Sequence, residues 1–455
     1  MPSNAGTKRE VAGEIHELGL ALLQAGKTPE AVFQFRKALT LSPDFPDAAV
    51  SLGYALHLLG KFDEAVSAYD RALGSAPTLA AAWNNRGNAL LALYRYAEAA
   101  ESYVRALELV PKLHDCRVAL ATCYQALGLA AEALGACETV LDAAPDHAEA
   151  HWNRALLLLL RGDYREGWRE YEWRWHKRGF TSPQRTFAQP RWQGEPLAGR
   201  TILIHAEQGF GDTLQFCRYV PLVAALGGRV VFECQPPLVA LMERLEGDIR
   251  VVATGAPLPA FDLQVPLMSL PMIFDTTAAT IPANVPYVAP PADRLPFWRS
   301  QIIDTEQRKI GLCWAGKAYP DPGRSCPAEL LASLAEIDAV SWHSLQVGWA
   351  QALPFPMADL TGHCHDFADT AAQIARLDLV ITVDTAVAHL AGAMGKATWV
   401  MLPHAPDWRW MLARDDSPWY PAMRLFRQAR SGGWADVVQR IACSLKSGVS
   451  RTDGD

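Results

Sequence analysis

Two short stretches of the sequence carry residue types that can do chemistry, and the first is GFGD. Gly209 and Gly211 flank a phenylalanine and lead directly to Asp212, just after a short apolar run. Glycine tolerates the backbone angles of a sharp strand-to-helix turn, and a carboxylate at such a turn can accept the proton of an attacking hydroxyl. We predict Asp212 as a general base, the two glycines as part of its binding site, and Gln208 as a residue that orients the acceptor. The alternative is that Asp212 only caps a helix.

The second stretch is DLVITVDTAVAHLAGAMG, residues 378–395. A strand is expected to end at Asp384 and a helix to open at Thr385, and the amides of a first helical turn have no partner inside the helix. Such amides favour an anion, so we predict that this turn binds a diphosphate. The alternative is a helix cap at Asp384 and a core histidine at His389. The residues of this predicted diphosphate site are Asp384, Thr385, Ala386, His389 and Leu390.

A cation near this turn would neutralise the charge that develops on a leaving diphosphate without a metal ion. Lys317 in CWAGK follows another apolar run, and Arg324 and Ser325 follow it in GRS. We predict Lys317 as a catalytic cation and Arg324 and Ser325 as donor-binding residues. A solvated loop is the alternative.

Two further residues are predicted on the donor side. Gln346 ends the run HSLQ, where its amide can read a base or a ribose. Trp408 lies in PDWRW, where it can form a wall for the donor sugar. Its neighbour Arg409 can share this wall, or both residues can form part of a hinge between the domains; a structural wedge is the alternative.

The expected secondary structure differs between the first third of the chain and the rest. In the first third the sequence repeats with a fixed period. A step of 34 residues relates alanines, prolines and an aromatic residue that follows each of the first three alanines by four positions. This period is typical of paired antiparallel helices that pack through small residues, and a proline ends each pair. We predict an α-solenoid of about five repeats over residues 10–179. The marker positions are Ala31, Ala65, Ala99 and Ala133, with Pro43, Pro77, Pro111 and Pro145.

A curved array of helix pairs offers a groove for an extended peptide. Asn84 and Asn88 lie in WNNRGN on a first helix, and we predict that their amides bind the backbone of an acceptor peptide. A surface for self-association and a mere spacer are the alternatives.

The second part of the chain alternates short apolar runs with amphipathic segments, which is typical of parallel, doubly wound α/β sheets. We predict a linker over residues 180–199, an acceptor-side Rossmann-like domain over 200–305 and a nucleotide-sugar-side Rossmann-like domain over 306–447. Ligands of such sheets lie beyond the carboxyl ends of the strands, where the chemistry-bearing residues fall.

Two resemblances sharpen this interpretation. The 34-residue pattern resembles the tetratricopeptide repeat. VDTAVAHLAGAMG resembles the nucleotide-binding motif of the heptosyltransferase family, and GFGDTLQF resembles its glycine–aspartate loop, with CWAGK, GRS and SLQ in the expected order between them. The resemblance implies the two-domain GT-B fold, Asp212 as base and a nucleotide-sugar donor. Repeats that precede such a module are similar in arrangement to the O-GlcNAc transferases.

The leading hypothesis is therefore a metal-independent glycosyltransferase that moves a sugar from a nucleoside-diphosphate donor to a hydroxyl of a protein or peptide held by the repeats. One alternative is a catalytically inactive adaptor built on the repeats. Another is a lipopolysaccharide-type heptosyltransferase, which leaves the repeats without a role.

The net charge, the length of the apolar runs and the cysteine content exclude several kinds of partner. The net charge of −7 and the isoelectric point near 6.0 argue against a nucleic-acid surface, and the apolar runs are too short to span a bilayer. Nine cysteines without a CxxC pair favour a reducing, cytoplasmic location. The consecutive residues His363, Cys364 and His365 do not converge on one ion, so we predict no metal and no cofactor.

Overall fold

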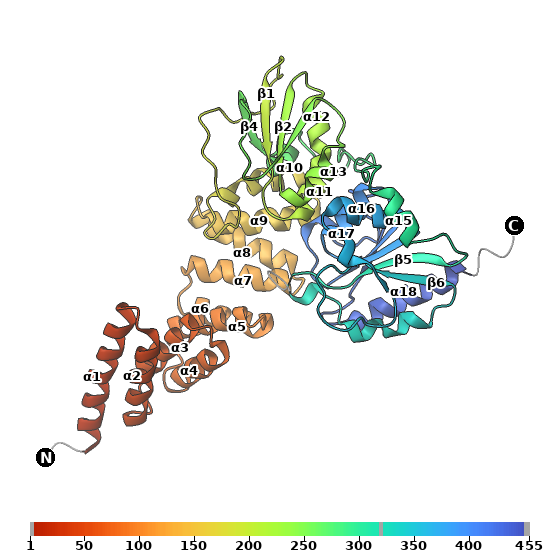
Figure 1. The fold of residues 1–455 in the computed structure, drawn as a ribbon. Coiled ribbons are helices and arrows are strands. Elements are labelled where there is room, and N and C mark those ends of the chain that lie inside the picture. Colours follow the sequence, from red (N-terminus) through yellow and green to blue (C-terminus); the bar gives the residue numbers. More distant parts are fainter. Residues whose placement is uncertain (1–3, 318–321, 450–455) are drawn as a thin grey trace. The chain divides into compact units, whose positions relative to one another are not determined.

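The computed structural model describes residues 4–317 and 322–449, and its chain divides into two compact units. The first unit is Met1–Leu157 and the second is Leu158–Asp455. The division falls inside one helix, α9 (Ala148–Arg161). Figure 1 traces the helices of the first unit in red to orange and the strands of the second in green to blue.

Helices that follow one another as antiparallel pairs build the first unit, and this confirms the predicted helical repeat array. Each pair spans about one 34-residue period. Its helices are α1 (Asn4–Gln24), α2 (Thr28–Leu41), α3 (Pro46–Leu58), α4 (Phe62–Ser75), α5 (Ala80–Ala92), α6 (Tyr96–Leu109), α7 (His114–Ala126) and α8 (Ala130–Ala143), before α9.

A glycine and an aromatic ring set the distance between the two helices of a repeat. A Cβ atom on Gly87 of α5 would lie 2.6 Å from the ring of Tyr103 on α6, and Gly53 stands in the same relation to Tyr69. Ala99 and Ala106 beside Tyr103 are fully buried. The periodic small residues are therefore required by close helix packing.

The second unit contains two parallel sheets, which confirms the predicted α/β region. The first sheet has the strand order β3-β2-β1-β4. Its strands are β1 (Thr201–His205), β2 (Arg229–Cys234), β3 (Ile249–Ala253) and β4 (Leu263–Pro266), with the short helices α11 (Phe210–Phe216), α12 (Val220–Ala224), α13 (Val239–Met242) and α14 (Leu270–Ile273).

The second sheet has the strand order β10-β9-β8-β5-β6-β7, and all of its strands are parallel. Ala328–Glu336 forms a 3-10 helix. The strands are β5 (Arg308–Cys313), β6 (Val340–Ser344), β7 (Ala358–Asp359), β8 (Leu379–Val383), β9 (Thr398–Leu402) and β10 (Met423–Arg427), and the helices are α15 (Leu295–Gln301), α16 (Phe367–Ala375), α17 (Ala386–Ala393) and α18 (Trp434–Val449).

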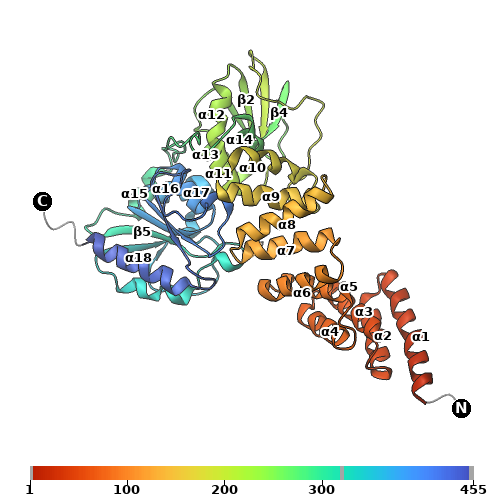
Figure 2. The ribbon, with the colours of Figure 1, turned by 180° about the vertical axis from the view of Figure 1, so that it is seen from behind.

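The helix that completes the fifth pair, α10 (Tyr164–Tyr171), lies in the second unit. Its aromatic face packs there, with the ring centroids of Trp168 and Trp408 5.3 Å apart in an edge-to-face arrangement. Figure 2 shows α10 close to α11 and α14 from behind. The segment after α10 also packs closely, because Trp192 is fully buried and its amide donates to the carbonyl of Gln264 on β4 at 2.9 Å.

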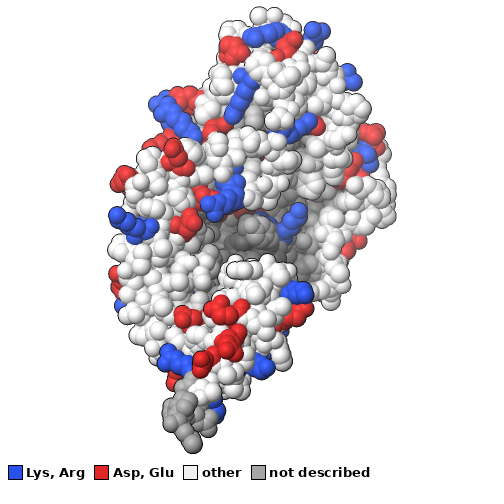
Figure 3. Space-filling model, turned by 90° about the vertical axis from the view of Figure 1, so that its left-hand side faces the viewer, with Lys and Arg blue, Asp and Glu red and all other residues white. Residues whose placement is uncertain are grey.

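Charges of both signs are mixed over the face shown in Figure 3. Among the described residues, none of the helices has both the length and the apolar character that a membrane span needs.

The glycine–aromatic contact leads to a first prediction. We expect Gly87→Ala to destabilise the first unit by about 1–3 kcal/mol, because the new methyl group overlaps the ring of Tyr103. Gly135 on α8 is the matched control, since a Cβ atom there meets no atom within 4 Å; Gly135→Ala should stabilise the unit by up to about 1 kcal/mol. Thermal unfolding of the full chain by circular dichroism measures both, and equal shifts would contradict the packing argument.

Candidate functional site

A cavity of about 720 Å³ lies in the second unit, where loops from both sheets meet. Its wall is built from segments that follow β1, β5, β6 and β8. The predicted site residues that line it are Gly209, Gly211, Asp212, Lys317, Arg324, Gln346, Asp384, Thr385, Ala386 and His389.

The strand order explains why segments far apart in the sequence meet here. In the second sheet β5 is paired with both β8 and β6, so the chain winds away from β5 in two directions. A crevice opens beyond the carboxyl ends of strands at such a switch point. The loop that carries Lys317 follows β5, and Asp384 follows β8.

Helix α17 opens at the wall of this cavity. Thr385 occupies the cap position with an extended backbone (φ −146°, ψ 173°), and its hydroxyl lies 3.2 Å from that of Thr382. Asp384 therefore precedes the cap and does not form it. The first residues of the helix, Ala386 and Val387, line the cavity, so the unpaired amides of the first turn belong to its wall.

Asp212 is held from two sides. One carboxylate oxygen accepts the amide of Gly209 at 2.8 Å, which closes a capping arrangement at the start of α11. The other oxygen is ion-paired with the guanidinium of Arg409. Gly209, and not Asp212, is therefore the N-cap of α11; Asp212 lies at the third helical position, bonds back to the cap amide and still lines the cavity.

Arg409 is buried and connects the two halves of the cavity. Besides Asp212 it contacts the carboxylate of Asp407 at 2.8 Å and the side-chain carbonyl of Gln215 at 2.8 Å. Gln215 and Asp212 lie on α11 of the first sheet's half, whereas Arg409 follows β9 of the second. The sequence led us to predict Arg409 in a wall or a hinge, but not its ion pair with Asp212. The position of this arginine between two tryptophans was the one feature of the sequence that indicated a buried guanidinium.

Two carboxylic acids of the cavity have raised pKa values. Burial raises the pKa of Asp212, and the nearby Arg409 and the Gly209 amide oppose this effect. Burial and the neighbouring Asp407 carboxylate raise the pKa of Asp384 to about 6, against the effect of Arg409.

His389 lies at the cavity as an uncharged ring. Its Nδ1 atom is 2.9 Å from the hydroxyl of Tyr420, and the ring stacks on Trp410 with centroids 5.4 Å apart. Burial and two arginines, Arg409 and Arg218, hold its pKa well below the usual range. A charged contact from His389 to a phosphate is therefore not supported, although a neutral ring can still donate a hydrogen bond.

The two glycines of GFGD serve other purposes than the predicted turn. Gly209 is extended (φ −88°, ψ 174°), and Gly211 lies inside α11 where a Cβ atom would approach His389 to 2.9 Å. The left-handed backbone of this loop is at Gln208 (φ 62°). Close contact between α11 and α17, and not turn flexibility, explains Gly211.

The cations at the cavity are joined through one carbonyl. Arg324 donates to the carbonyl of Lys317 through Nη2 at 2.9 Å and Nε at 3.2 Å. Lys317 itself is exposed, and residues 318–321 between the two cations lie outside the described part. Ser325 does not line the cavity; its hydroxyl accepts the amide of Gly316 at 3.1 Å.

Two predicted binding residues make contacts that support the fold, although Gln346 also lines the cavity. The amide of Gln346 accepts from the amides of Trp314 and Ala315 and donates to the carbonyl of Ala315, so it braces the loop after β5. Trp408 is buried among Trp168 and other rings, as the structural alternative had it.

Three more of the predicted residues do not line the cavity. Leu390 is fully buried in α17. In the first unit, Asn88 accepts the hydroxyl of Tyr103 at 2.8 Å, and Asn84 donates to Asn85 at 3.2 Å. Both asparagines are half-buried on α5. In the described ranges, no three His, Cys, Asp or Glu side chains form a group that could hold a metal ion.

Comparison with known families identifies the repeats. Tetratricopeptide-repeat models match residues 16–80, 59–114 and 90–159. The N-terminal part of the chain is a tetratricopeptide-repeat solenoid. Solved structures similar to it include MamA 41-end from Desulfovibrio magneticus RS-1 (19% identity, 35% of this chain and 91% of that one, TM-score 0.34) and Pseudomonas aeruginosa pilF (26%, 37% and 76%, TM-score 0.33). A third is the first repeat domain of Spaghetti (RPAP3) bound to the HSP90 peptide SRMEEVD (30%, 26% and 93%, TM-score 0.26).

A curated relative extends beyond the repeats. Protein FlbA of Caulobacter vibrioides is 28% identical over 354 residues, which cover 70% of this chain. The match spans 59% of the length of FlbA, which is less than two thirds of that protein.

The raised pKa of Asp384 leads to a second prediction. Because the folded protein raises this pKa from 3.8 to about 6, the folded state binds the proton more tightly than the unfolded chain, and stability falls as the pH rises through this interval. Asp384→Asn stays neutral. We expect it to be more stable than the wild type by roughly 3 kcal/mol, a few degrees in melting temperature, at about pH 8, and nearly equal at about pH 4.

Asp304 supplies a control of opposite sign. Hydrogen bonds from Lys309 and Arg376 lower its pKa to about 2, so its ionised form stabilises the fold above the ordinary pKa, and this stability is lost as the pH falls through about 2. Asp304→Asn should therefore melt below the wild type near neutral pH. An Asp384→Asn variant that behaved like Asp304→Asn would contradict the electrostatic assignment.

Proposed function

We propose that the second unit is a metal-independent glycosyltransferase of GT-B architecture, which moves a sugar from a nucleoside-diphosphate donor to a hydroxyl of a protein or peptide bound by the repeats. One observation supports this most. A single cavity joins a carboxylate from the first turn of α11, a helix start after β8 and cations from the loop after β5. These are a base, an anion site and a charge neutraliser.

The donor would lie on the side of the second sheet. The first turn of α17 offers free amides to the diphosphate, and Lys317 and Arg324 stand across the same cavity. Trp349 also lines it, with its ring 5.3 Å from that of Trp314. A flat aromatic wall suits a nucleoside base.

The chemical step follows from these positions. The acceptor hydroxyl forms a new bond to the anomeric carbon of the donor sugar while Asp212 takes its proton. The bond between that carbon and the diphosphate oxygen breaks, and the electron pair leaves with the diphosphate. Lys317 and Arg324 neutralise the charge on this leaving group, which replaces the usual task of a metal ion.

The acceptor would be brought by the solenoid. Tetratricopeptide arrays present their first helices to a peptide, and Asn84 on such a helix is half-buried at the surface of α5. A protein acceptor gives the repeats a task, which a small-molecule acceptor does not.

A second candidate function has one observation in its favour. Asp212 is ion-paired with Arg409, and an occupied carboxylate is what a repeat adaptor without catalysis would show. In that case the cavity would not turn over a donor, and the repeats would carry the function.

Nucleotide binding tests the donor site. Calorimetric titration with ADP, UDP, GDP and CMP in the absence of divalent metal should show micromolar binding of one of them. Lys317→Ala should weaken that binding about tenfold or more, the size of one charge-assisted contact. Lys446→Ala on α18 is the matched control and should leave it unchanged, since Lys446 is exposed and does not line the cavity. If none of the four binds, the donor site is contradicted and the adaptor is favoured.

A separate variant tests the base. Asp212→Asn keeps the size and the hydrogen bond to Gly209 but cannot take a proton, so turnover should fall by about 10²–10⁴-fold. Nucleotide affinity measured on the same sample should change little. Turnover that survives Asp212→Asn would assign the base to another residue.

A further inference from the structure

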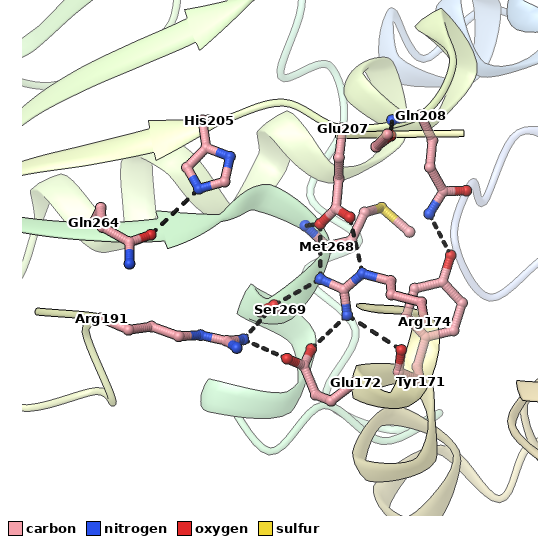
Figure 4. Close-up of polar contacts among 11 residues, drawn as sticks. Tyr171, Glu172, Arg174, Arg191, His205, Glu207, Gln208, Gln264, Met268 and Ser269 are labelled. Carbon is pink, nitrogen blue, oxygen red and sulfur yellow. Dashed lines mark hydrogen bonds and ion pairs between the residues drawn. The ribbon is translucent and has the colours of Figure 1, made fainter. Parts of the chain in front are cut away.

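The segment that ends the repeat array packs against the loop that leads to Asp212. This segment is α10 with the short 3-10 helix Glu172–Trp175, and the loop is Ala206–Gly209 between β1 and α11. Figure 4 shows Arg174 pointing into the loop, with its guanidinium between Glu207 and Glu172. Arg174 is fully buried.

The contacts of Arg174 are short and saturate its donors. It binds Glu207 through Nε and Nη2 at 2.8 Å each, and Glu172 through Nη1 at 2.7 Å. Nη2 also donates to the hydroxyl of Ser269 at 2.8 Å. A two-pronged pair between a guanidinium and a carboxylate fixes the direction of both groups, so Arg174 determines where Glu207 lies.

The cluster is electrically balanced and ties together two strand ends. Arg191 pairs with Glu172 from the other side and donates to Ser269 at 2.7 Å, which makes two cations and two carboxylates. Glu207 also accepts the amide of Met268 after β4 at 3.1 Å. Buried charges are tolerated only in good geometry, so the cluster permits little movement of the loop after β1 relative to the loop after β4.

The next residue of the loop is held by Tyr171. Gln208 donates from its side-chain amide to the hydroxyl of Tyr171 at 2.6 Å, and its backbone amide donates to the hydroxyl of Ser182 at 2.7 Å. Its left-handed backbone (φ 62°) is unfavourable for a residue other than glycine. Such a conformation persists only where the surroundings impose it.

This strained residue directly precedes the contact that orients the proposed base. The amide of Gly209 donates to Asp212, so a change in the backbone of Gln208 would turn the donor that aims the carboxylate. Glu207 is fixed by Arg174 and Gln208 by Tyr171, and the orientation of Asp212 follows from them.

We propose that Tyr171 and Arg174 are positioning residues for Asp212, so that the helix completing the repeat array is part of the catalytic unit. The proposal rests on the proposed function. Neither residue lines the cavity; each acts through the loop, and α10 is as much a component of the site as the strands are.

The test uses Tyr171→Phe in the full chain, because this change removes one hydroxyl and keeps the ring. Tyr103→Phe is the matched control: its hydroxyl is also bound to a side-chain amide, that of Asn88 at 2.8 Å, and its ring is fully buried in the first unit. Hydrogen–deuterium exchange of residues 207–212 should become about five- to tenfold faster in Tyr171→Phe. Tyr103→Phe should leave it unchanged.

A second variant removes the same hydrogen bond from the other end. Gln208→Met should reproduce the faster exchange, and the double variant should add little to either single change, because both remove one interaction. Exchange in residues 207–212 of Tyr171→Phe that equals the wild type would overturn the positioning role.

Turnover separates positioning from binding. Release of UDP, ADP, GDP or CMP from UDP-glucose, ADP-glucose, GDP-mannose or CMP-sialic acid should show kcat about tenfold or more lower in Tyr171→Phe, with KM and nucleotide affinity unchanged. A raised KM at unchanged kcat would overturn the proposal. A wild type that binds no nucleotide and turns over no donor would contradict the proposed function, and the exchange comparison would still decide the positioning role.

Discussion

A charge removed from water must find a partner of opposite sign, and this constraint shapes the second unit. Arg409 and Arg174 are both buried, and each is shared between two carboxylates. One partner of each arginine lies on the short stretch from Glu207 to Asp212. The two ion pairs therefore hold this stretch from opposite ends: Arg174, on the 3-10 helix after α10, fixes its beginning, and Arg409, which follows β9, fixes its end.

The cavity is a consequence of that arrangement and of one missing side chain. Gly211 allows α11 to approach His389 on α17 closely, since a Cβ atom there would lie 2.9 Å from the ring. With these two helices in contact, Asp212 and the first turn of α17 line one cavity. A side chain at position 211 would overlap the ring of His389 unless the two helices moved apart.

The sequence was enough for features that depend on local pattern, and insufficient for those that depend on distant partners. The 34-residue period follows from contacts inside one repeat, such as Gly87 with Tyr103, and the helix start at Thr385 follows from the residues next to it. Arg174 and Glu207 are 33 residues apart, and Asp212 and Arg409 are 197 apart. No local pattern in the sequence predicts these pairs. The arginines flanked by tryptophans in YEWRWHKR and PDWRW indicate buried arginines, but not their partners. Trp408 was assigned to the ligand, yet it is buried and does not line the cavity, because an aromatic residue after a strand looks the same in the sequence whether it binds a substrate or packs in the core.

The ion pair between Asp212 and Arg409 bears directly on the choice between an enzyme and an adaptor. A carboxylate has about four acceptor positions on its two oxygens, and the structure uses one oxygen for the Gly209 amide and the other for Arg409. Each oxygen thus keeps a position for an acceptor hydroxyl. Burial alone would favour the protonated acid, which cannot act as a base, whereas the guanidinium favours the ionised form that can. Arg409 therefore opposes the effect of burial on the pKa of Asp212 and holds the carboxylate in one direction, and both effects suit a general base. The ion pair is thus compatible with the proposed catalytic role as well as with an adaptor.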